Sequence, residues 1–312
     1  MNEAKGVRIV FMGTPEFAVA SLDAICKAGY QLVGVITAPD RLAGRGMKLT
    51  ESAVKKYAVE NGLRVLQPLK LKDPHFLDEL RSLKADLQIV VAFRMLPELV
   101  WNMPPMGTVN LHGSLLPQYR GAAPINWAII NGEKETGVTT FKLKHEIDTG
   151  DILWQEKMLI GANETFGEVH DRMKEIGASV LVKTVAGLKD GSLKEIPQSS
   201  IEHENLHSAP KIFTDHCRID WTASVEAVHN LVRGLSPVPG AFTSFQGKMF
   251  KIFRSEIETR DTNGETSSYQ SDGKTYLKFA CKDGYLLVKE LQLEGKKRMG
   301  IEDFLRGNKV NP

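Results

Sequence analysis

The chain has 312 residues, of which 42% are hydrophobic and 25% are charged, and its formal net charge is +2. A chain of this length exceeds the size at which one hydrophobic core usually stops growing, so we expect two domains. The balance of apolar and charged residues is that of a folded globular protein and argues against disorder over most of the length. The net charge is too small, by itself, to indicate a nucleic-acid-binding protein.

The apolar runs and the cysteines exclude further classes. Runs such as 87–93 are far shorter than the roughly 20 residues that cross a bilayer, and the polar N-terminus has no signal-peptide core. We therefore expect a cytoplasmic protein with no membrane partner. Cys26, Cys217 and Cys281 form neither a CxxC pair nor a zinc-binding spacing, and no HExxH or EF-hand pattern is present. The sequence predicts reduced thiols and no bound metal.

The first half of the chain alternates short apolar runs with amphipathic stretches. Continuous apolar strands that alternate with helices are typical of a parallel sheet covered on both faces. The pattern therefore predicts a doubly wound, Rossmann-like α/β domain. We expect strands at 7–12, 32–37, 64–66, 87–92, 108–111 and 139–143, and helices at 15–28, 51–61, 73–84 and 123–131.

Composition changes further along the chain predict where the domains divide. An antiparallel strand at 152–160 is followed by a long helix, whose start is marked by a capping box of Thr165 and Glu168. The stretch 191–210 is rich in serine and has little periodicity, which is typical of a linker. The sequence thus predicts a catalytic domain at 1–190, a linker at 191–210 and a second domain at 211–312.

The sequence predicts that the second domain is small, mildly basic and built mainly of β-strands. Short strands separated by turns predict a small β-barrel of the OB-like kind. From Ala209 onward the chain has 16 Lys and Arg against 13 Asp and Glu, which suits a polyanionic partner but is also common among soluble domains. We expect a helix at 224–235, strands at 241–245, 249–254, 276–280 and 285–291, and a polar loop at 261–272.

Polar side chains at the ends of predicted strands carry the chemistry. Asn110 and His112 end the strand that begins at Thr108, and alternation along an extended chain puts both on one face. Asp148 follows the next predicted strand. Ligands of open parallel sheets collect beyond the carboxyl ends of the strands. An amide, an imidazole and a carboxylate gathered there could polarise a carbonyl, move a proton and orient the imidazole or a water.

Each of these residues also has a structural explanation. A single histidine at a strand end is more often a hydrogen-bonded structural residue than a catalyst. An aspartate before Thr149-Gly150 is more often a turn former. Their joint occurrence at the ligand edge of one predicted sheet favours catalysis.

Several motifs resemble the methionyl-tRNA formyltransferase family. The resemblance spans almost the whole chain. Its most specific element is the SLLPxYRG run at 114–121, which is typical of folate-dependent formyltransferases, and the tail motifs point to the tRNA branch among them. The motifs that carry it are FMGTPEFA at 11–18, NLHGSLLPQYRG at 110–121, DTGDI at 148–152, APKI at 209–212, IDW at 219–221, RGLSP at 233–237, PGA at 239–241 and LQLEGKK at 291–297.

The resemblance implies a fold and an activity. It implies a formyltransferase-type sheet domain that transfers a formyl group from 10-formyltetrahydrofolate, the co-substrate, to the α-amine of methionyl initiator tRNA. Asn110, His112 and Asp148 fall on the family's catalytic trio, with Asn110 and protonated His112 on the oxyanion and Asp148 holding His112 or a water. We expect a monomer. The folate-binding positions that the resemblance implies are Phe93, Ser114, Leu115, Leu116, Pro117 and Asp148.

The resemblance also implies a path for the tRNA. The loop at 39–48 carries three cations among its glycines, which without a family would be interpreted as a solvated loop. The family uses a similar loop at the acceptor end of the tRNA, which makes Arg41 the leading candidate, with Arg45 and Lys48 behind it. Guanidinium groups pair with phosphates and can reach base edges. In the tail we expect phosphate contacts from Lys211, Lys248 and Lys297.

One departure and three alternatives stand beside this interpretation. Family members often have Ala-Tyr-Gly where this chain has Ala92-Phe93-Arg94, which leaves open the local loop shape and any role for Arg94.

The first alternative is a formyltransferase acting on a small amine, such as an amino sugar or a purine precursor. Such an enzyme would not need the tail domain or the Arg41 loop. A non-catalytic RNA-binding protein would have no reason to keep the trio together. A dinucleotide oxidoreductase would need the GxGxxG fingerprint, which is absent.

Overall fold

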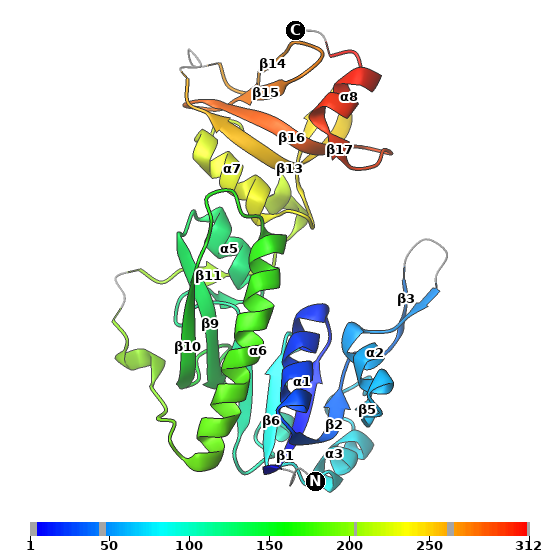
Figure 1. Ribbon diagram of the computed structural model, residues 1–312, viewed down its shortest axis with the longest axis vertical. Coiled ribbons are helices and arrows are strands. Elements are labelled where there is room, and N and C mark those ends of the chain that lie inside the picture. The colour runs from blue at the N-terminus through cyan, green and yellow to red at the C-terminus, as the bar shows by residue number, and fades with distance from the viewer. Residues whose placement is uncertain (1–4, 44–47, 203–204, 261–264, 311–312) are drawn as a thin grey trace. The chain divides into compact units, whose positions relative to one another are not determined.

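The computed structural model describes residues 5–43, 48–202, 205–260 and 265–310, which group into two compact units (Figure 1). The first unit consists of Met1–Arg120, Gly137–Met158 and Asp171–His207. The second unit consists of Gly121–Thr136, Leu159–His170 and Ser208–Pro312. The chain thus passes between the units several times, and the linear division at 1–190, 191–210 and 211–312 remains a prediction. None of the helices in the described ranges has the length and apolar character needed to cross a membrane.

A seven-stranded sheet forms the centre of the first unit, in the order β10-β9-β7-β6-β1-β2-β5. The pairs β1–β2, β1–β6, β6–β7 and β2–β5 are parallel, as the sequence predicts. The strands of the sheet are β1 (Lys5–Gly13), β2 (Tyr30–Ile36), β5 (Val65–Leu66), β6 (Leu87–Val91), β7 (Thr108–His112), β9 (Glu135–Lys142) and β10 (Ile152–Leu159).

Helices cover both faces of this sheet, which explains why its central strands are apolar throughout. On one face, Leu111 of β7 packs against Gly177 of α6, and Nζ of Lys174 in α6 lies 3.5 Å from Oε1 of Glu16 in α1. On the other face, a buried cluster joins alternate residues of β1, such as Val10, to α3 and α4. The helices of the first unit are α1 (Glu16–Lys27), α2 (Ala53–Glu60), α3 (Pro74–Ser82), α4 (Glu98–Trp101) and most of α6 (Phe166–Asp190), whereas α5 (Pro124–Ile130) belongs to the second unit.

One strand of the predicted parallel set runs the other way. Strand β9 is antiparallel to β7, with His112 opposite Thr139 and Val109 opposite Lys142. The prediction that this strand ends at the same edge of the sheet as β7 is therefore wrong. The end of β9 lies three residues, about 10 Å, back along β7 from His112. The segment that follows must return along the sheet to bring Asp148 to His112.

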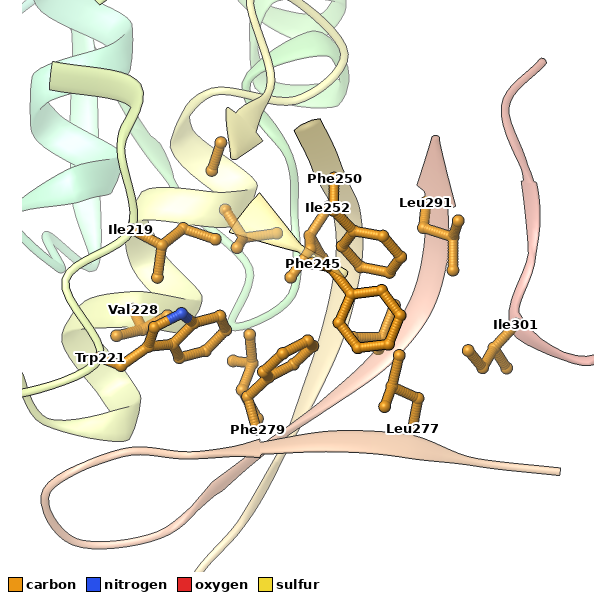
Figure 2. Packing of buried hydrophobic residues seen from close by; sticks show 14 of the residues in the cluster. Ile219, Trp221, Val228, Phe245, Phe250, Ile252, Leu277, Phe279, Leu291 and Ile301 are labelled. Carbon is orange, nitrogen blue, oxygen red and sulfur yellow. The ribbon is translucent and has the colours of Figure 1, made fainter. Parts of the chain in front are cut away.

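The second unit is built on an antiparallel sheet of six strands, with β12, β13, β16, β15 and β14 in order and β17 beside β16. Figure 2 shows its core, in which Trp221 stacks on Phe279 at a centroid distance of 4.6 Å and Phe245 and Phe250 fill the space beside them. The elements are α7 (Val225–Gly234), β12 (Ala241–Phe245), β13 (Lys248–Glu258), β14 (Tyr269–Ser271), β15 (Leu277–Ala280), β16 (Tyr285–Leu293), β17 (Met299–Gly300) and α8 (Ile301–Gly307).

Several short elements lie where the sequence predicts loops. The stretch 39–48 contains β3 (Arg41–Ala43), which forms a hairpin with β4 (Lys48–Thr50), and Arg41 is opposite Thr50. The predicted linker contains the 3-10 helix η1 (Gln198–Ser200) and β11 (Ser208–Ala209), which pairs with β8 (Arg120–Gly121). A further 3-10 helix, η2 (Thr214–Cys217), precedes α7. Gln198 of η1 bonds to Asp148 and Gly150, which are distant in the sequence, so no local apolar pattern marks this element.

The predicted capping box is confirmed at the start of α6. Glu168 Oε2 accepts hydrogen bonds of 2.8 Å from both the backbone N–H and the hydroxyl of Thr165, and Arg254 donates to Glu168 Oε1 at 2.6 Å. Burial pushes the pKa of Glu168 upward. The bonds from Thr165 and Arg254 outweigh burial, and the pKa falls to about 2.

This pKa predicts how Glu168 contributes to stability. Because the carboxyl pKa is lower in the folded chain, the contribution is complete above the unfolded value, about 4.5, and is lost as the pH falls toward 2. We expect Glu168→Gln to lower the free energy of unfolding at pH 7 by about 1 kcal/mol, the size of a helix cap with partly screened charge. Denaturant titrations at pH 7 and pH 3 measure it, with a smaller difference expected at pH 3. A matched control is Glu226→Gln in the first turn of α7, where the side chain is 65% exposed. A pH-independent difference would contradict the assignment.

Candidate active site

His112 ends β7 with its imidazole almost buried, the side chain being 7% exposed. Its Nε2–H donates to the carbonyl oxygen of Tyr119 at 2.9 Å. Tyr119 has a φ of +58°, which is unusual for a bulky residue. It is held there by a 2.8 Å bond from its own N–H to the carbonyl of His207 and by stacking on the His207 ring. The ring orientation of His112 is therefore fixed through one nitrogen.

The other nitrogen of His112 faces Asp148. Its Nδ1 lies 3.8 Å from Oδ2 of Asp148, whose side chain is 11% exposed. This separation exceeds a direct hydrogen bond and leaves a small closure or a bridging atom to complete the contact. When both ring nitrogens of His112 are protonated, Nε2–H faces the Tyr119 carbonyl and Nδ1–H faces the Asp148 carboxylate. When only Nε2 is protonated, the lone pair of Nδ1 faces the carboxylate.

Asn110 lies two residues before His112 on β7 and therefore faces the same side of the sheet. It is opposite Val90 of β6 and Phe141 of β9. Its side chain is partly exposed, and within the described ranges no hydrogen bond satisfies its amide. The amide is thus available as a donor. The structure brings His112 and Asp148 together and puts Asn110 on the same face of the same strand.

The turn that carries Asp148 is fixed by close backbone packing. Asp148 has a φ of +54°, a conformation that aspartate tolerates better than most residues. Two residues on, an added Cβ at Gly150 would lie 1.6 Å from the carbonyl oxygen of Lys142. The N–H of Lys142 also donates to the carbonyl of Asp151 at 3.0 Å. The turn is therefore anchored to the end of β9.

The predicted folate-binding run Ser114 to Pro117 is largely buried. The Ser114 hydroxyl donates to the carbonyl of Gln118 at 2.6 Å, and Leu116 packs with Phe141 and Ile152. Pro117 is buried and Leu115 half-buried. These contacts support the segment that ends at Tyr119. Contact of the four residues with a ligand stays a prediction.

Arg94, the residue after Phe93, lines a hollow of about 510 Å³ in the first unit. Phe93 is half-buried, with the Arg94 guanidinium 5.6 Å from its ring centre. Arg94 donates to the carbonyls of Pro68 and Leu69, so the departure from the family pattern has a structural role. Burial, and next the like charge of Arg41, lower the pKa of Arg94. The hollow is lined by Leu71, Lys72, Arg94, Met95, Leu96, Pro97, Glu98 and Leu99.

The predicted tRNA-binding residues lie mostly on the surface. Arg41 is exposed on β3, and Lys211, Lys248 and Lys297 are exposed in the second unit. Arg45 lies outside the described residues, and of Lys48 only the backbone, at the start of β4, is described. Their action as tRNA-binding residues stays a prediction.

Comparison with known proteins decides the family. The family model described as "Formyl transferase" matches residues 7–185, and the model described as "Formyl transferase, C-terminal domain" matches residues 211–309. A methionyl-tRNA formyltransferase of Parabacteroides distasonis is 55% identical, with 97% of this chain and 96% of the relative covered. One from Bacteroides fragilis is 50% identical, with 96% and 95% covered. The chain belongs to the methionyl-tRNA formyltransferase family.

Solved structures agree with this family in fold. An N-formyltransferase from Helicobacter canadensis, crystallised with folinic acid and dTDP-3-aminofucose, has a TM-score of 0.68 and 21% identity, covering 90% of this chain and 98% of that one. HypX from Aquifex aeolicus, crystallised with tetrahydrofolic acid, has a TM-score of 0.61 and 21% identity, covering 96% of this chain and 47% of that one. The expected two-part formyltransferase fold is confirmed, and the chain is a formyltransferase.

Three residues that shape this candidate site were missed in the sequence. Tyr119 and Gly150 lie within the motifs at 110–121 and 148–152, but the sequence does not show that they position His112 and Asp148. Gln198, in the predicted linker, donates to the carbonyls of Asp148 and Gly150. No local pattern marks a glutamine among serines as part of a site.

Proposed function

We propose that this formyltransferase moves the formyl group of 10-formyltetrahydrofolate to the α-amine of methionine carried by initiator tRNA, for translation initiation in the cytoplasm. The observation that carries the proposal is the pairing of His112 with Asp148 at the end of β7, beside the unbonded amide of Asn110. A carboxylate, an imidazole and an amide donor are the groups that acyl transfer to an amine requires. Relatives of about half-identical sequence bear the name of this activity.

The chemistry has two steps, each with a task for these residues. The methionine nitrogen attacks the formyl carbon, a C–N bond forms, and negative charge develops on the formyl oxygen. Asn110 donates its amide N–H to that oxygen, and so does His112 when its Nδ1 is protonated. The bond from carbon to N10 of the folate then breaks. The proton lost by the attacking amine reaches N10 through His112, or through a water held by Asp148, so that both reacting nitrogens end neutral.

The hollow lined by Arg94 suits the folate. Its lining is mostly apolar, and Lys72 and Arg94 bring positive charge to a ligand that ends in carboxylates. His145, three residues before Asp148, lies 3.3 Å from Glu98 in the wall of this hollow. We propose that the folate lies along this wall with its formyl group at His112.

The β3–β4 hairpin suits an RNA end. Arg41 is exposed on it, and within the described ranges no carboxylate pairs with Arg41. Leu42 and Leu49, opposite one another in the hairpin, are 57% and 65% exposed. Exposed apolar side chains beside a guanidinium fit the stacked and frayed bases of an acceptor end better than they fit a small amine. Lys211, Lys248 and Lys297 are proposed as phosphate contacts.

Arg41→Ala is expected to raise KM for methionyl-tRNA by roughly tenfold, the worth of one charge-assisted hydrogen bond, and to leave KM for the folate unchanged. The slope of log KM against log salt should fall by about one, since one phosphate contact is lost. Steady-state kinetics at several salt concentrations measure both. Arg81→Ala, on exposed α3, is the matched control. An unchanged KM for tRNA in Arg41→Ala would rule out the proposed contact.

One assay over a panel of acceptors tests the function. The protein is incubated with 10-formyltetrahydrofolate and, separately, methionylated initiator tRNA, methionylated elongator tRNA, a nucleotide-linked amino sugar and a purine-precursor amine. N-formyl product is measured in each. Labelling of the initiator alone supports the proposal. Labelling of a small amine alone supports the alternative formyltransferase and overturns the tRNA substrate.

A further inference from the structure

The side chain of Gln198 is buried, 4% exposed, and all its polar groups are bonded. Its Oε1 accepts from Nε and Nη2 of Arg120 at 3.0 and 2.6 Å. Its Nε2 donates to the carbonyls of Asp148 and Gly150 at 2.9 and 2.8 Å. The amide orientation follows from these partners, because the opposite one would turn N–H groups toward the guanidinium and the oxygen toward two carbonyls.

These four bonds join the two segments that orient His112. Arg120 follows Tyr119, whose carbonyl accepts from Nε2 of His112. The carbonyls of Asp148 and Gly150, which accept from Nε2 of Gln198, belong to the turn that places the Asp148 carboxylate near Nδ1 of His112. Gln198 therefore fixes the spacing between the groups on either side of the imidazole. A residue of the segment that the sequence marks as a linker controls the geometry of the catalytic pair.

We propose that Gln198 is a positioning residue for formyl transfer, which holds the Asp148 turn at the distance from His112 that proton transfer needs. The inference rests on the proposed function of His112 and Asp148. Gln198 does not touch the reacting atoms, so it acts on turnover and leaves substrate affinity alone. Carbonyls of the turn that lose their donors can shift, and a shift of about 1 Å at a reacting group can cost as much as a hundredfold in rate.

Removing the Gln198 side chain leaves its segment attached elsewhere. Ile196 and Ile152 exchange two backbone hydrogen bonds of 2.8 and 2.9 Å. Gln118 bonds the carbonyl of Asn205 at 2.6 Å and the N–H of His207 at 2.9 Å. We therefore expect Gln198→Met to fold.

The kinetic test uses the full chain, 10-formyltetrahydrofolate and methionylated initiator tRNA. We expect Gln198→Met to lower kcat roughly tenfold, with either KM changed by less than about twofold. The matched control is Gln88→Met, which removes an equally buried glutamine whose partner, Thr108, begins β7 at the end opposite His112. The control should lose thermal stability without losing kcat. Equal losses of kcat in the two variants would show that Gln198 is only structural.

Two further variants separate positioning from other causes. Gln198→Glu keeps an acceptor for Arg120 but has no N–H for the turn, so we expect the same loss as in Gln198→Met. Full activity of Gln198→Glu would overturn the proposal. In an Asp148→Asn background, Gln198→Met should have little further effect, because the two residues act through one contact. Independent, multiplicative losses would also overturn it. If Asp148→Asn alone keeps normal turnover, the assigned role of Asp148 fails instead, which distinguishes the two failures.

Discussion

Replacing Asn110 with alanine is expected to lower kcat for formyl transfer by about a hundred- to a thousandfold, with KM for both substrates nearly unchanged. The side-chain amide has no hydrogen-bond partner within the described residues, so its removal leaves little unsatisfied in the resting protein. On the proposed role of Asn110, what is lost is a donor to the oxygen on which charge develops, and this interaction strengthens only as the reaction proceeds. Single-turnover measurements with saturating folate separate that step from product release.

Two variants control this result. Asn110→Asp keeps the shape of the side chain but offers no N–H, so it should lose at least as much activity as Asn110→Ala. Asn61→Ala, at the exposed end of α2, should keep full kcat. Near-normal turnover of Asn110→Ala would show that the amide does not stabilise the oxyanion.

Gly150→Ala is expected to lower kcat by about a hundredfold, because the turn that carries Asp148 must move. An added methyl would lie 1.6 Å from the carbonyl oxygen of Lys142, a backbone atom that no rotamer change can remove. We also expect a loss of about 1–3 kcal/mol in the free energy of unfolding, the usual penalty for overpacking. Denaturant titration measures the stability, and kcat with both substrates saturating measures the catalytic effect.

A second glycine provides the comparison for Gly150. An added Cβ at Gly6 meets nothing within 4 Å, so Gly6→Ala should change neither stability nor rate. If Gly150→Ala were as active as Gly6→Ala, the position of Asp148 would not depend on this packing.

The sequence predicts the central fold well because the responsible forces are local or periodic. The strands and helices around β1 follow from continuous apolar runs and amphipathic spacing, and the start of α6 follows from Thr165 and Glu168. The reversed direction of β9 was missed, since strand direction depends on what a strand pairs with and not on its own residues. The β3–β4 hairpin was missed for a similar reason. Its exposed leucines leave no buried face to give an alternating pattern.

The candidate site was only partly visible in the sequence. Asn110 and His112 follow from strand alternation, because they lie on one element. The approach of Asp148 to His112 arises from a returning segment, the packing of Gly150 and the bonds of Gln198. Those are long-range contacts, and a single sequence does not encode them in its spacing.

The reversed direction of β9 constrains how many residues may separate that strand from Asp148. The segment leaves the sheet near Val109 and must reach back to His112, so its contour length is matched to a set distance. One inserted or deleted residue changes that length by up to about 3.5 Å, which is close to the whole gap between the imidazole and the carboxylate. Substitutions between the end of β9 and Asp148 should therefore be tolerated better than insertions or deletions there.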